Sequence, residues 1–358
     1  MDRDLLDLYS DYLLCSSRQT TATGLSGLVN GTVSHDKITR FLSDHDMDEK
    51  TLWKKIKRVV REYENDGACL IFDDTIIEKE YMDENEIICW YYDHKRGQTV
   101  KGINLLTAFY SAEKGGDIVR IPVGYRILAK TEKYRDEKTG QERRKSPVTK
   151  NEMMRDMIGR QIRNEVKFGF VLADSWYSSA ENMRFIDKKK KTFIFELKEN
   201  RQVTADEGKR GRGEFERADH LAIPEGEPVK VWLKDLSFAV VLFKQVFTNK
   251  DQSRGTRFLV SNDLTLTEEQ FRTLYKKRWG VEEYHKSLKQ NASVGSSPAH
   301  TERTQSNHIF AAIFGFVKLE KLKVSKKINH FAIKTMIYMA SLKTALSAYD
   351  SFVNAPPA

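Results

Sequence analysis

Two short apolar segments of the sequence each end in acidic residues. The run ACLIF (68–72) leads into Asp73 and Asp74, and KFGFVLA (167–173) leads into Asp174. Runs of this length indicate buried strands, and ligands of open α/β sheets bind where strands end. Two carboxylates held close together ionise together only with a cation between them, and hard oxygen ligands suit Mg²⁺ or Mn²⁺. The pattern favours a metal site, although a single Asp after a strand more often only caps the following turn.

A third set of polar residues lies in the segment 265–290. A capping box of Thr267 and Gln270 begins the segment and predicts the start of a helix. Further along stand Tyr275, Arg278, Glu282 and Lys289, at offsets of 0, 3, 7 and 14. A continuous helix would place all four on one stripe. A carboxylate there could bind metal, and the phenol, guanidinium and ammonium groups could hold phosphates.

This helical stripe has a simpler interpretation as well. Arg278 and Glu282 are four residues apart, so they could form a surface ion pair worth only some tenths of a kcal/mol. Gly280 also lies inside the segment, where it costs about 1 kcal/mol in a helix and could mark a bend.

The segments around these residues predict how they are held. Residues 66–196 alternate strand and helix patterns, which favours an α/β layer. The strand candidates besides the two acidic ones are GINLLTAFY (102–110), IVRIPVGYRIL (118–128) and TFIFEL (192–197), and the helix candidates are 151–166 and 180–191. The charged stretch 130–147 is predicted to be a mobile surface loop.

The regions on either side of this α/β layer differ from it in predicted secondary structure. Residues 1–65 are predicted to be helical, because apolar residues recur at helical spacing between Leu52 and Tyr63 with basic residues on the other faces. They suit either a helix-turn-helix-like DNA reader or a plain helical bundle. Residues 198–256 are predicted to be β-rich, with a hairpin over 229–247, and the chain from Thr267 onward is predicted to be mostly helical.

Composition narrows the class of protein. The apolar fraction of 40% is enough for a core, and no apolar run approaches the ~18 residues of a membrane span. The N-terminus lacks the layout of a secretion signal, and three isolated cysteines fit a reducing cytoplasm. Neither a zinc-ligand motif nor a P-loop is present, so we expect neither zinc nor a nucleotide cofactor. The net charge of +9 permits a polyanion partner.

The spacing Tyr275-x2-Arg278-x3-Glu282-x6-Lys289 matches the Y-R-E-K signature of bacterial insertion-sequence transposases. The chain resembles the insertion-sequence-four family of DDE transposases over nearly its whole length. The resemblance implies an α/β fold with an RNase H-like catalytic core that is interrupted by a β-rich insertion, with helical N-terminal and C-terminal regions. The implied parts are a helical DNA-binding region (1–65), the first part of the core (66–197), the insertion (198–256), the second part of the core with the YREK helix (257–295) and a helical tail (296–358).

The same resemblance implies a catalytic triad. Its members would be Asp73, Asp174 and Glu282, which would bind two Mg²⁺ or Mn²⁺ ions. The family's first acidic residue is often followed by any residue and then Thr or Ser, which selects Asp73 with Thr75. Asp74 stays an alternative first member. Because side chains alternate across a strand, only one of the two can face the site.

Five residues are candidates for DNA contact. Tyr275, Arg278 and Lys289 would hold phosphates near the cut, most simply at the transposon end. Trp176 follows the second Asp and could contact DNA, although core packing is the commoner role for a tryptophan. Trp232 could stack on a flipped base, as an aromatic residue does in family members.

The implied activity is cut-and-paste DNA transposition. The enzyme would cleave the transposon ends and then join them to target DNA. Its partners would be the terminal inverted repeats, target DNA and a second copy of the chain on DNA, with no membrane, and its location would be the cytoplasm, at the nucleoid. Two alternatives stay open, namely an RNase H-like nuclease without strand transfer and an inactive transposase-derived DNA-binding protein. The intact acidic set and YREK stripe weigh against the inactive protein.

Overall fold

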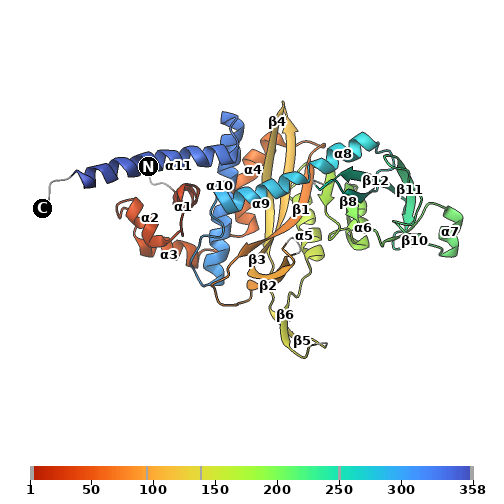
Figure 1. Cartoon of the computed structure of the whole chain (residues 1–358), viewed down its shortest axis with the longest axis horizontal. Coiled ribbons are helices and arrows are strands. Elements are labelled where there is room, and N and C mark those ends of the chain that lie inside the picture. Colours follow the sequence, from red (N-terminus) through yellow and green to blue (C-terminus); the bar gives the residue numbers. More distant parts are fainter. Residues whose placement is uncertain (1–3, 94–95, 138, 249–250, 355–358) are drawn as a thin grey trace. The chain divides into compact units, whose positions relative to one another are not determined.

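The structure, a computed structural model, describes residues 4–93, 96–137, 139–248 and 251–354, and the chain divides into two units (Figure 1). Unit 1 comprises Met1–Ile56, Ile76–Asn104 and Tyr284–Ala358, and unit 2 comprises Lys57–Thr75 and Leu105–Glu283. The three predicted acidic positions, Asp73, Asp174 and Glu282, all belong to unit 2.

Unit 2 is built on a large mixed sheet, which confirms the predicted mixed α/β class. Its strands follow the order β10-β9-β11-β12-β13-β8-β7-β1-β3, and β4 pairs with β3 off this path. Their bounds are β1 (Cys69–Glu78), β3 (Gln98–Lys114), β4 (Asp117–Ile127), β7 (Phe170–Ala173), β8 (Thr192–Leu197), β9 (Gln202–Thr204), β10 (Glu216–Arg217), β11 (Pro228–Leu233), β12 (Val240–Thr248) and β13 (Arg254–Ser261). The strands β1 and β3 continue into unit 1.

The centre of this sheet is parallel. Strand β7 pairs in parallel with β1 on one side and with β8 on the other, whereas β13, β12 and β11 continue antiparallel from β8. Parallel neighbours need crossover connections, and helices α5 and α6 lie between these strands in the sequence. The apolar run Leu70 to Phe72 is fully buried, as expected of central parallel strands.

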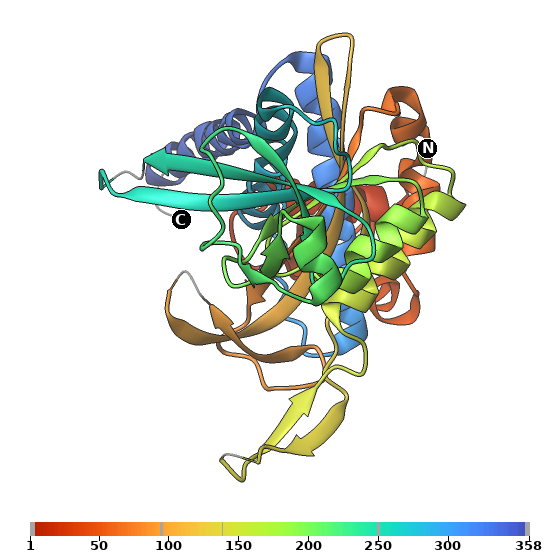
Figure 2. The same ribbon diagram turned by 90° about the vertical axis from the view of Figure 1, so that its right-hand side faces the viewer.

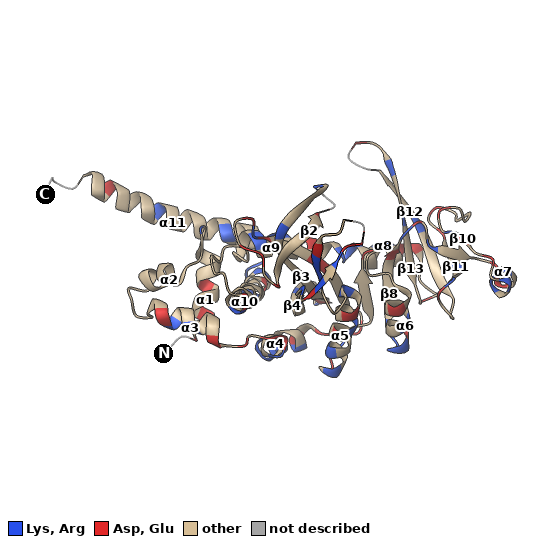
Figure 3. Ribbon diagram, turned by 90° about the horizontal axis from the view of Figure 1, so that it is seen from below, with Lys and Arg blue, Asp and Glu red and all other residues tan. Residues whose placement is uncertain are grey.

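Helices cover the sheet of unit 2. They are α5 (Lys150–Arg163), α6 (Ala180–Lys188), α7 (Glu207–Arg212), α8 (Glu268–Lys276) and α9 (Trp279–Asn291), whose last part belongs to unit 1. The Thr267–Gln270 capping box is present at the start of α8, as predicted. Helices α5 and α6 lie side by side, joined by Arg155 donating to Asn182 (2.7 Å), and their outward surfaces carry Lys and Arg (Figure 3).

The charged stretch predicted as a mobile loop contains a β-hairpin instead. Strands β5 (Glu132–Arg135) and β6 (Glu142–Lys145) pair antiparallel as a separate two-stranded sheet that projects from unit 2 (Figure 2). Ion pairs join Lys133 to Glu142 (2.9 Å) and Lys145 to Glu132 (3.6 Å) across the strands. The prediction was wrong because opposite charges face each other at both ends of the hairpin strands, Glu132 with Lys145 and Arg135 with Glu142, which stabilises the pairing.

Unit 1 is mainly helical. Its helices are α1 (Leu5–Cys15), α2 (Ala22–Leu28), α3 (His35–Asp44), the start of α4 (Glu49–Tyr63), α10 (Glu302–Lys326) and α11 (His330–Val353), and β2 (Ile88–Asp93) pairs antiparallel with the first half of β3. Gly102 on β3 permits a close approach to the end of β1, because a Cβ there would lie 2.4 Å from the carbonyl oxygen of Ile77. Of the described residues, no helix is long and apolar enough to cross a membrane.

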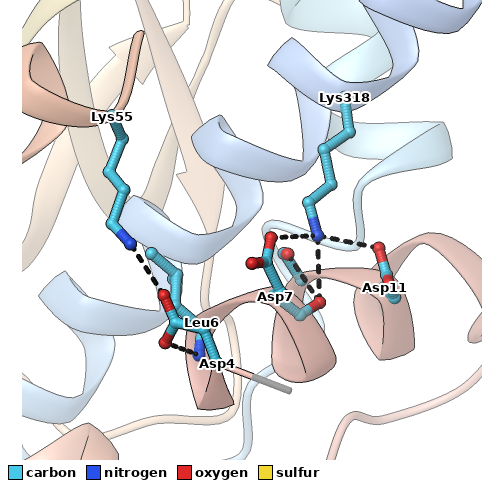
Figure 4. A network of polar contacts seen from close by, with 7 residues as sticks. Asp4, Leu6, Asp7, Asp11, Lys55 and Lys318 are labelled. Atoms are coloured by element: carbon cyan, nitrogen blue, oxygen red, sulfur yellow. Dashed lines mark hydrogen bonds and ion pairs between the residues drawn. The ribbon is translucent and has the colours of Figure 1, made fainter. Parts of the chain in front are cut away.

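Polar contacts fasten α1 to its neighbours within unit 1 (Figure 4). Lys318 of α10 pairs with Asp7 and Asp11, each at 2.9 Å, and Lys55 of α4 pairs with Asp4 at 2.7 Å. Deeper in the unit, His308 is fully buried, and burial lowers its pKa to about 4. It is therefore held neutral at physiological pH.

Candidate active site

The register of the parallel strands lines up three acidic residues. Phe72 of β1 pairs with Ala173 of β7, which pairs with Phe195 of β8. The residue that follows each of these positions is acidic, namely Asp73, Asp174 and Glu196. Equivalent positions on parallel neighbours face the same side of a sheet. We call these three residues the strand-end row, because each follows the last paired position of the parallel register. The strand β1 itself continues to Glu78, so the prediction that it ends before Asp73 was wrong.

Asp73 is the most perturbed member of the row. Its side chain is 13% exposed, and burial raises its pKa to about 8, with further increases from the charges of Asp174, Asp74 and Glu282. The Arg278 guanidinium opposes these effects, with its Nη1 3.9 Å from Asp73 Oδ2. The structure therefore brings Asp73, Asp174 and Glu282 into one electrostatic neighbourhood.

Asp174 lies in a similar environment. Burial raises its pKa, and the nearby charges of Asp74 and Glu196 raise it further. The backbone N–H of Trp176 donates to Asp174 Oδ1 at 2.9 Å. This bond and the Arg278 charge lower the pKa of Asp174 and so partly oppose the effect of burial. The bond also fixes the orientation of the carboxylate in the turn after β7.

Asp74 has dedicated partners that Asp73 does not share. Lys150 pairs with its Oδ2 at 2.8 Å, and the Tyr177 hydroxyl donates to its Oδ1 at 2.6 Å. Tyr177 is itself buried, which together with the Asp74 charge raises its pKa well above the usual value. A cation and a hydrogen-bond donor from this unit thus already compensate the Asp74 carboxylate.

The predicted continuous stripe of YREK residues is interrupted. Helix α8 ends at Lys276 and α9 begins at Trp279, and the Arg278 N–H bonds to the Tyr275 carbonyl (3.0 Å) in a tight three-residue turn. Gly280 lies just after the break, where a Cβ would lie 3.0 Å from Arg120 Nε. The bend that Gly280 indicated is therefore real. Arg278 and Glu282 both still act on Asp73 across it.

The remaining YREK residues are placed differently. Tyr275 is buried (5% exposed), and its hydroxyl donates to Glu196 Oε2 at 3.1 Å. Lys289 is exposed on the last turn of α9, in the part of that helix that belongs to unit 1. The structure thus unites Tyr275, Arg278 and Glu282 within unit 2 and assigns Lys289 to the other unit.

The solvent exposure of the two tryptophans differs from what core packing of Trp176 and base stacking on Trp232 would require. Trp176 is 53% exposed, so core packing is wrong for it, and the ammonium groups of Lys150 and Lys198 lie 5.2 and 5.7 Å from its ring centroid. Trp232 is only 6% exposed and packs beneath Lys230, 5.0 Å from its ring centroid. A base could not stack on Trp232 in this conformation, because the ring is covered.

Sequence reasoning missed Glu196. Its signal was weak, because Glu196 interrupts the apolar pattern TFIFEL one residue before its end, whereas the two aspartates follow theirs. Only the register of β7 and β8 shows that it continues the row.

The donor set fits a hard divalent cation in its chemistry. In the described part of the chain, no group of three or more His, Cys, Asp or Glu side chains is arranged to hold a metal ion as it stands. The raised pKa values of Asp73 and Asp174 nevertheless show carboxylates confined with too little positive charge. Oxygen donors in that situation are suited to Mg²⁺ or Mn²⁺.

Comparison with protein families agrees with this chemistry. A family model described as "DDE superfamily endonuclease" matches residues 1–218, which is more than half of the chain. The chain belongs to this superfamily of endonucleases. A second model, described as "Transposase DDE domain", matches residues 140–315, and together the two matches support a transposase.

Among solved structures, the chain is similar to a piggyBac transposase in a cryo-EM synaptic complex with hairpin DNA. The identity is 12%, the match covers 100% of this chain and 74% of that one, and the TM-score is 0.47. Neither fold nor function follows from a similarity at this level. No curated protein gives a significant match.

Proposed function

We propose that this chain is a transposase of the insertion-sequence-four type that cleaves the ends of its element and joins them to target DNA. The observation that carries the proposal is the environment of Asp73, whose pKa is raised to about 8 by burial and by neighbours that include Asp174 and Glu282. These are the three residues that the Y-R-E-K resemblance assigns to the triad. Their carboxylates would hold two Mg²⁺ or Mn²⁺ ions.

When bound, such ions activate water or a 3′-hydroxyl and stabilise the leaving oxygen in phosphoryl transfer. The chain's own contribution is to hold the carboxylates. The Trp176 N–H orients Asp174, and Arg278 supplies positive charge beside Asp73. The two central strands fix the spacing of Asp73 and Asp174, because their backbones are paired up to the preceding residue.

Asp73, rather than Asp74, is the proposed first ligand. Asp74 is already compensated by Lys150 and Tyr177, so a cation would gain less from approaching it. Asp73 instead lies among like charges and next to a single guanidinium. We infer that Asp74 anchors α5 and the turn after β7 to the middle of β1.

DNA contacts are proposed from the cations and the exposed ring near this site. Arg278 would hold a phosphate when ions have taken over compensation of Asp73. Trp176, with Lys150 and Lys198 beside its ring, presents an exposed aromatic surface flanked by ammonium groups, an arrangement that binds single-stranded DNA. Lys289 would contact the backbone from α9, and Tyr275 would act through its buried hydroxyl.

The wider organisation is part of the same proposal. Unit 2 would contain an RNase H-like core, in which the strands between residues 198 and 256 form the β-rich insertion. The N-terminal helices would read the terminal repeats, and two copies of the chain would assemble on DNA at the nucleoid.

A cleavage assay on element-end DNA tests the triad. Asp174→Asn, Asp73→Asn and Glu282→Gln preserve side-chain size, and each should lower the single-turnover rate with Mg²⁺ or Mn²⁺ by about 10³-fold or more. Asp74→Asn is the matched control and should keep activity within about tenfold. Full activity of Asp174→Asn would overturn the mechanism, and loss through Asp74→Asn alone would overturn the choice of Asp73.

A second arm of the assay tests strand transfer. Pre-cut element ends are supplied with a target plasmid, and joined products are measured by gel electrophoresis. We expect joining that requires the same three carboxylates. Hydrolysis without any joined product would instead identify a nuclease.

A further inference from the structure

The third member of the strand-end row differs from the other two in having partners. A single oxygen of Glu196, Oε2, accepts a hydrogen bond from the Tyr275 hydroxyl (3.1 Å) and pairs with Arg257 Nε (3.2 Å). For Asp73, the nearest guanidinium nitrogen described is Arg278 Nη1, at the longer distance of 3.9 Å. The negative charge of Glu196 is therefore already compensated by Tyr275 and Arg257. We infer that Glu196 has a role other than binding a metal ion.

Arg257 is held in a fixed orientation by this contact and by two rings. Its guanidinium carbon lies 5.2 Å from the Phe247 ring centroid and 5.5 Å from that of Tyr275. The ion pair to Glu196 uses Nε, on the inner edge of the guanidinium. Beyond Nε, a guanidinium has an end-on edge formed by its two terminal nitrogens, and this edge can grip a phosphate bidentately.

Arg257 and Glu196 both line one cavity of about 380 Å³. Its lining includes Ser175, Glu196, Lys198, Arg217 and Arg257. Ser175 directly follows Asp174 in the chain, so this cavity borders the proposed catalytic position. Arg217 is engaged by Asp219 through two bonds of 2.9 and 2.6 Å, whereas Lys198 lies over Trp176.

We propose that Glu196 is a positioning residue that fixes Arg257 as a DNA-phosphate contact in this cavity. The inference rests on the proposed function, since it takes the ligand to be the DNA whose cleavage the site performs. Arg257 would bind one backbone phosphate next to the scissile position, and Tyr275 would hold Glu196 from the opposite side. The contact reads no base, because phosphates carry no sequence information.

DNA binding without catalysis tests this inference separately from the cleavage mechanism. The full chain is titrated with a fluorescent element-end duplex in EDTA, and Kd is measured by anisotropy at several salt concentrations. Arg257→Ala should weaken binding about tenfold and lower the salt slope by about 1, the value expected for one lost phosphate contact. The matched control is Arg212→Ala, because Arg212 pairs with Glu214 through Nε in the same way (2.6 Å) but lies outside the cavity.

Variants of Glu196 test the positioning role. Glu196→Ala should weaken DNA binding by part of the factor seen for Arg257→Ala. Combined with Arg257→Ala, it should cause no further loss of affinity. Glu196→Gln keeps an acceptor for Tyr275 and should give an intermediate Kd, and it serves in place of the alanine variant if that variant unfolds. In both Glu196 variants the loss of DNA affinity should exceed any loss in the single-turnover cleavage rate at saturating DNA.

Three results would overturn the inference. An unchanged Kd and salt slope in Arg257→Ala would remove the phosphate contact. Full additivity of Glu196→Ala and Arg257→Ala would separate the two residues. A collapse of the cleavage rate with DNA affinity intact would place Glu196 among the metal ligands. Inactivity of the whole protein in cleavage would contradict the proposed function, while leaving the binding result interpretable.

Discussion

Both units of this protein bury acidic side chains, but they surround them in opposite ways. In unit 1, Glu320 is 3% exposed and is bonded to His330 Nε2 (2.9 Å) and Lys323 Nζ (2.6 Å). Burial alone would raise its pKa, yet these bonds outweigh burial and lower it. In unit 2, Asp73 is similarly enclosed, and its pKa is raised to about 8.

The difference separates a carboxylate with a structural role from the one that we propose as a metal ligand. Glu320 has its full complement of charge partners, so its ionised form stabilises the fold. Asp73 lies among like charges, so its ionised form is unfavourable until a cation is added. Perturbed pKa values of the second kind are typical of functional sites.

The order of the bonded side chains alone would have suggested that the carboxylate of unit 1, Glu320, belongs to a catalytic site. Ser287 Oγ lies 3.0 Å from His330 Nδ1, and His330 Nε2 contacts Glu320, which is the order of groups in a Ser-His-acid catalytic triad. All three residues are at most 6% exposed, and the amide of Asn291 donates to Ser287 Oγ at 2.9 Å. With no access for a substrate, the chain of bonds fastens α9, α10 and α11 together.

The largest effect that would sharpen this comparison is on the stability of unit 1. Glu320→Ala leaves His330 and Lys323 without their acid, so we expect a loss of about 3 kcal/mol in the free energy of unfolding. Thermal and urea unfolding measure it. Asp350→Asn, on an exposed turn of α11, is the control and should change stability by less than about 0.5 kcal/mol. Equal stability of the Glu320 variant and wild type would show that the buried pairs contribute nothing.

The substitution Asp73→Asn should have the opposite effect and increase the free energy of unfolding. The folded pKa of about 8 lies above the unfolded value of 3.8, so folding is favoured by protonation, and this contribution is lost as pH rises from about 4 to about 8. We expect the variant to be more stable than wild type by about 1 kcal/mol or more at pH 8, although it should be inactive.

The control for this prediction is Asp74→Asn. It removes the partner of Lys150 and Tyr177, so it should destabilise the protein. Melting temperatures measured from pH 5 to pH 8 should show the gap between Asp73→Asn and wild type widening with pH. A gap that is constant with pH would mean that Asp73 is ionised throughout.

The smallest effect concerns the half-exposed network of Figure 4. Lys318→Met removes the pairs to Asp7 and Asp11 but keeps most of the aliphatic stem, so we expect a loss of up to about 1 kcal/mol. Salt at 1 M should reduce the difference from wild type, since it screens partly exposed pairs. A larger, salt-independent loss would place this network with Glu320 rather than with surface pairs.

Part of the site could be predicted because it depends on local pattern. Asp73 and Asp174 each follow an apolar run, and a run of that kind is short enough to identify a strand. The predicted end was right for β7, which stops at Ala173, and wrong for β1, which continues to Glu78. The α8 capping box could be predicted for the same reason, since its two members are three residues apart.

The rest depends on contacts between distant segments. Glu196 joins the row only through the register of β8, and its partner Arg257 comes from β13. The exposure of Trp176 and the burial of Trp232 are set by what packs over each ring, which their neighbours in sequence do not reveal. The prediction of one stripe did not include the break before α9, because placing residues on one stripe at 3.6 residues per turn assumes a continuous helix.

The strand-end row makes the chemistry sensitive to chain length within a strand. Deleting a single residue from β7 would turn Asp174 to the opposite face of the sheet, while the composition and net charge of the chain would hardly change. Deleting two would restore the face and shorten the strand. Under the proposed function, Mn²⁺ affinity would therefore report whether the three central strands have paired in their native alignment, so that metal binding would serve as a probe of correct folding.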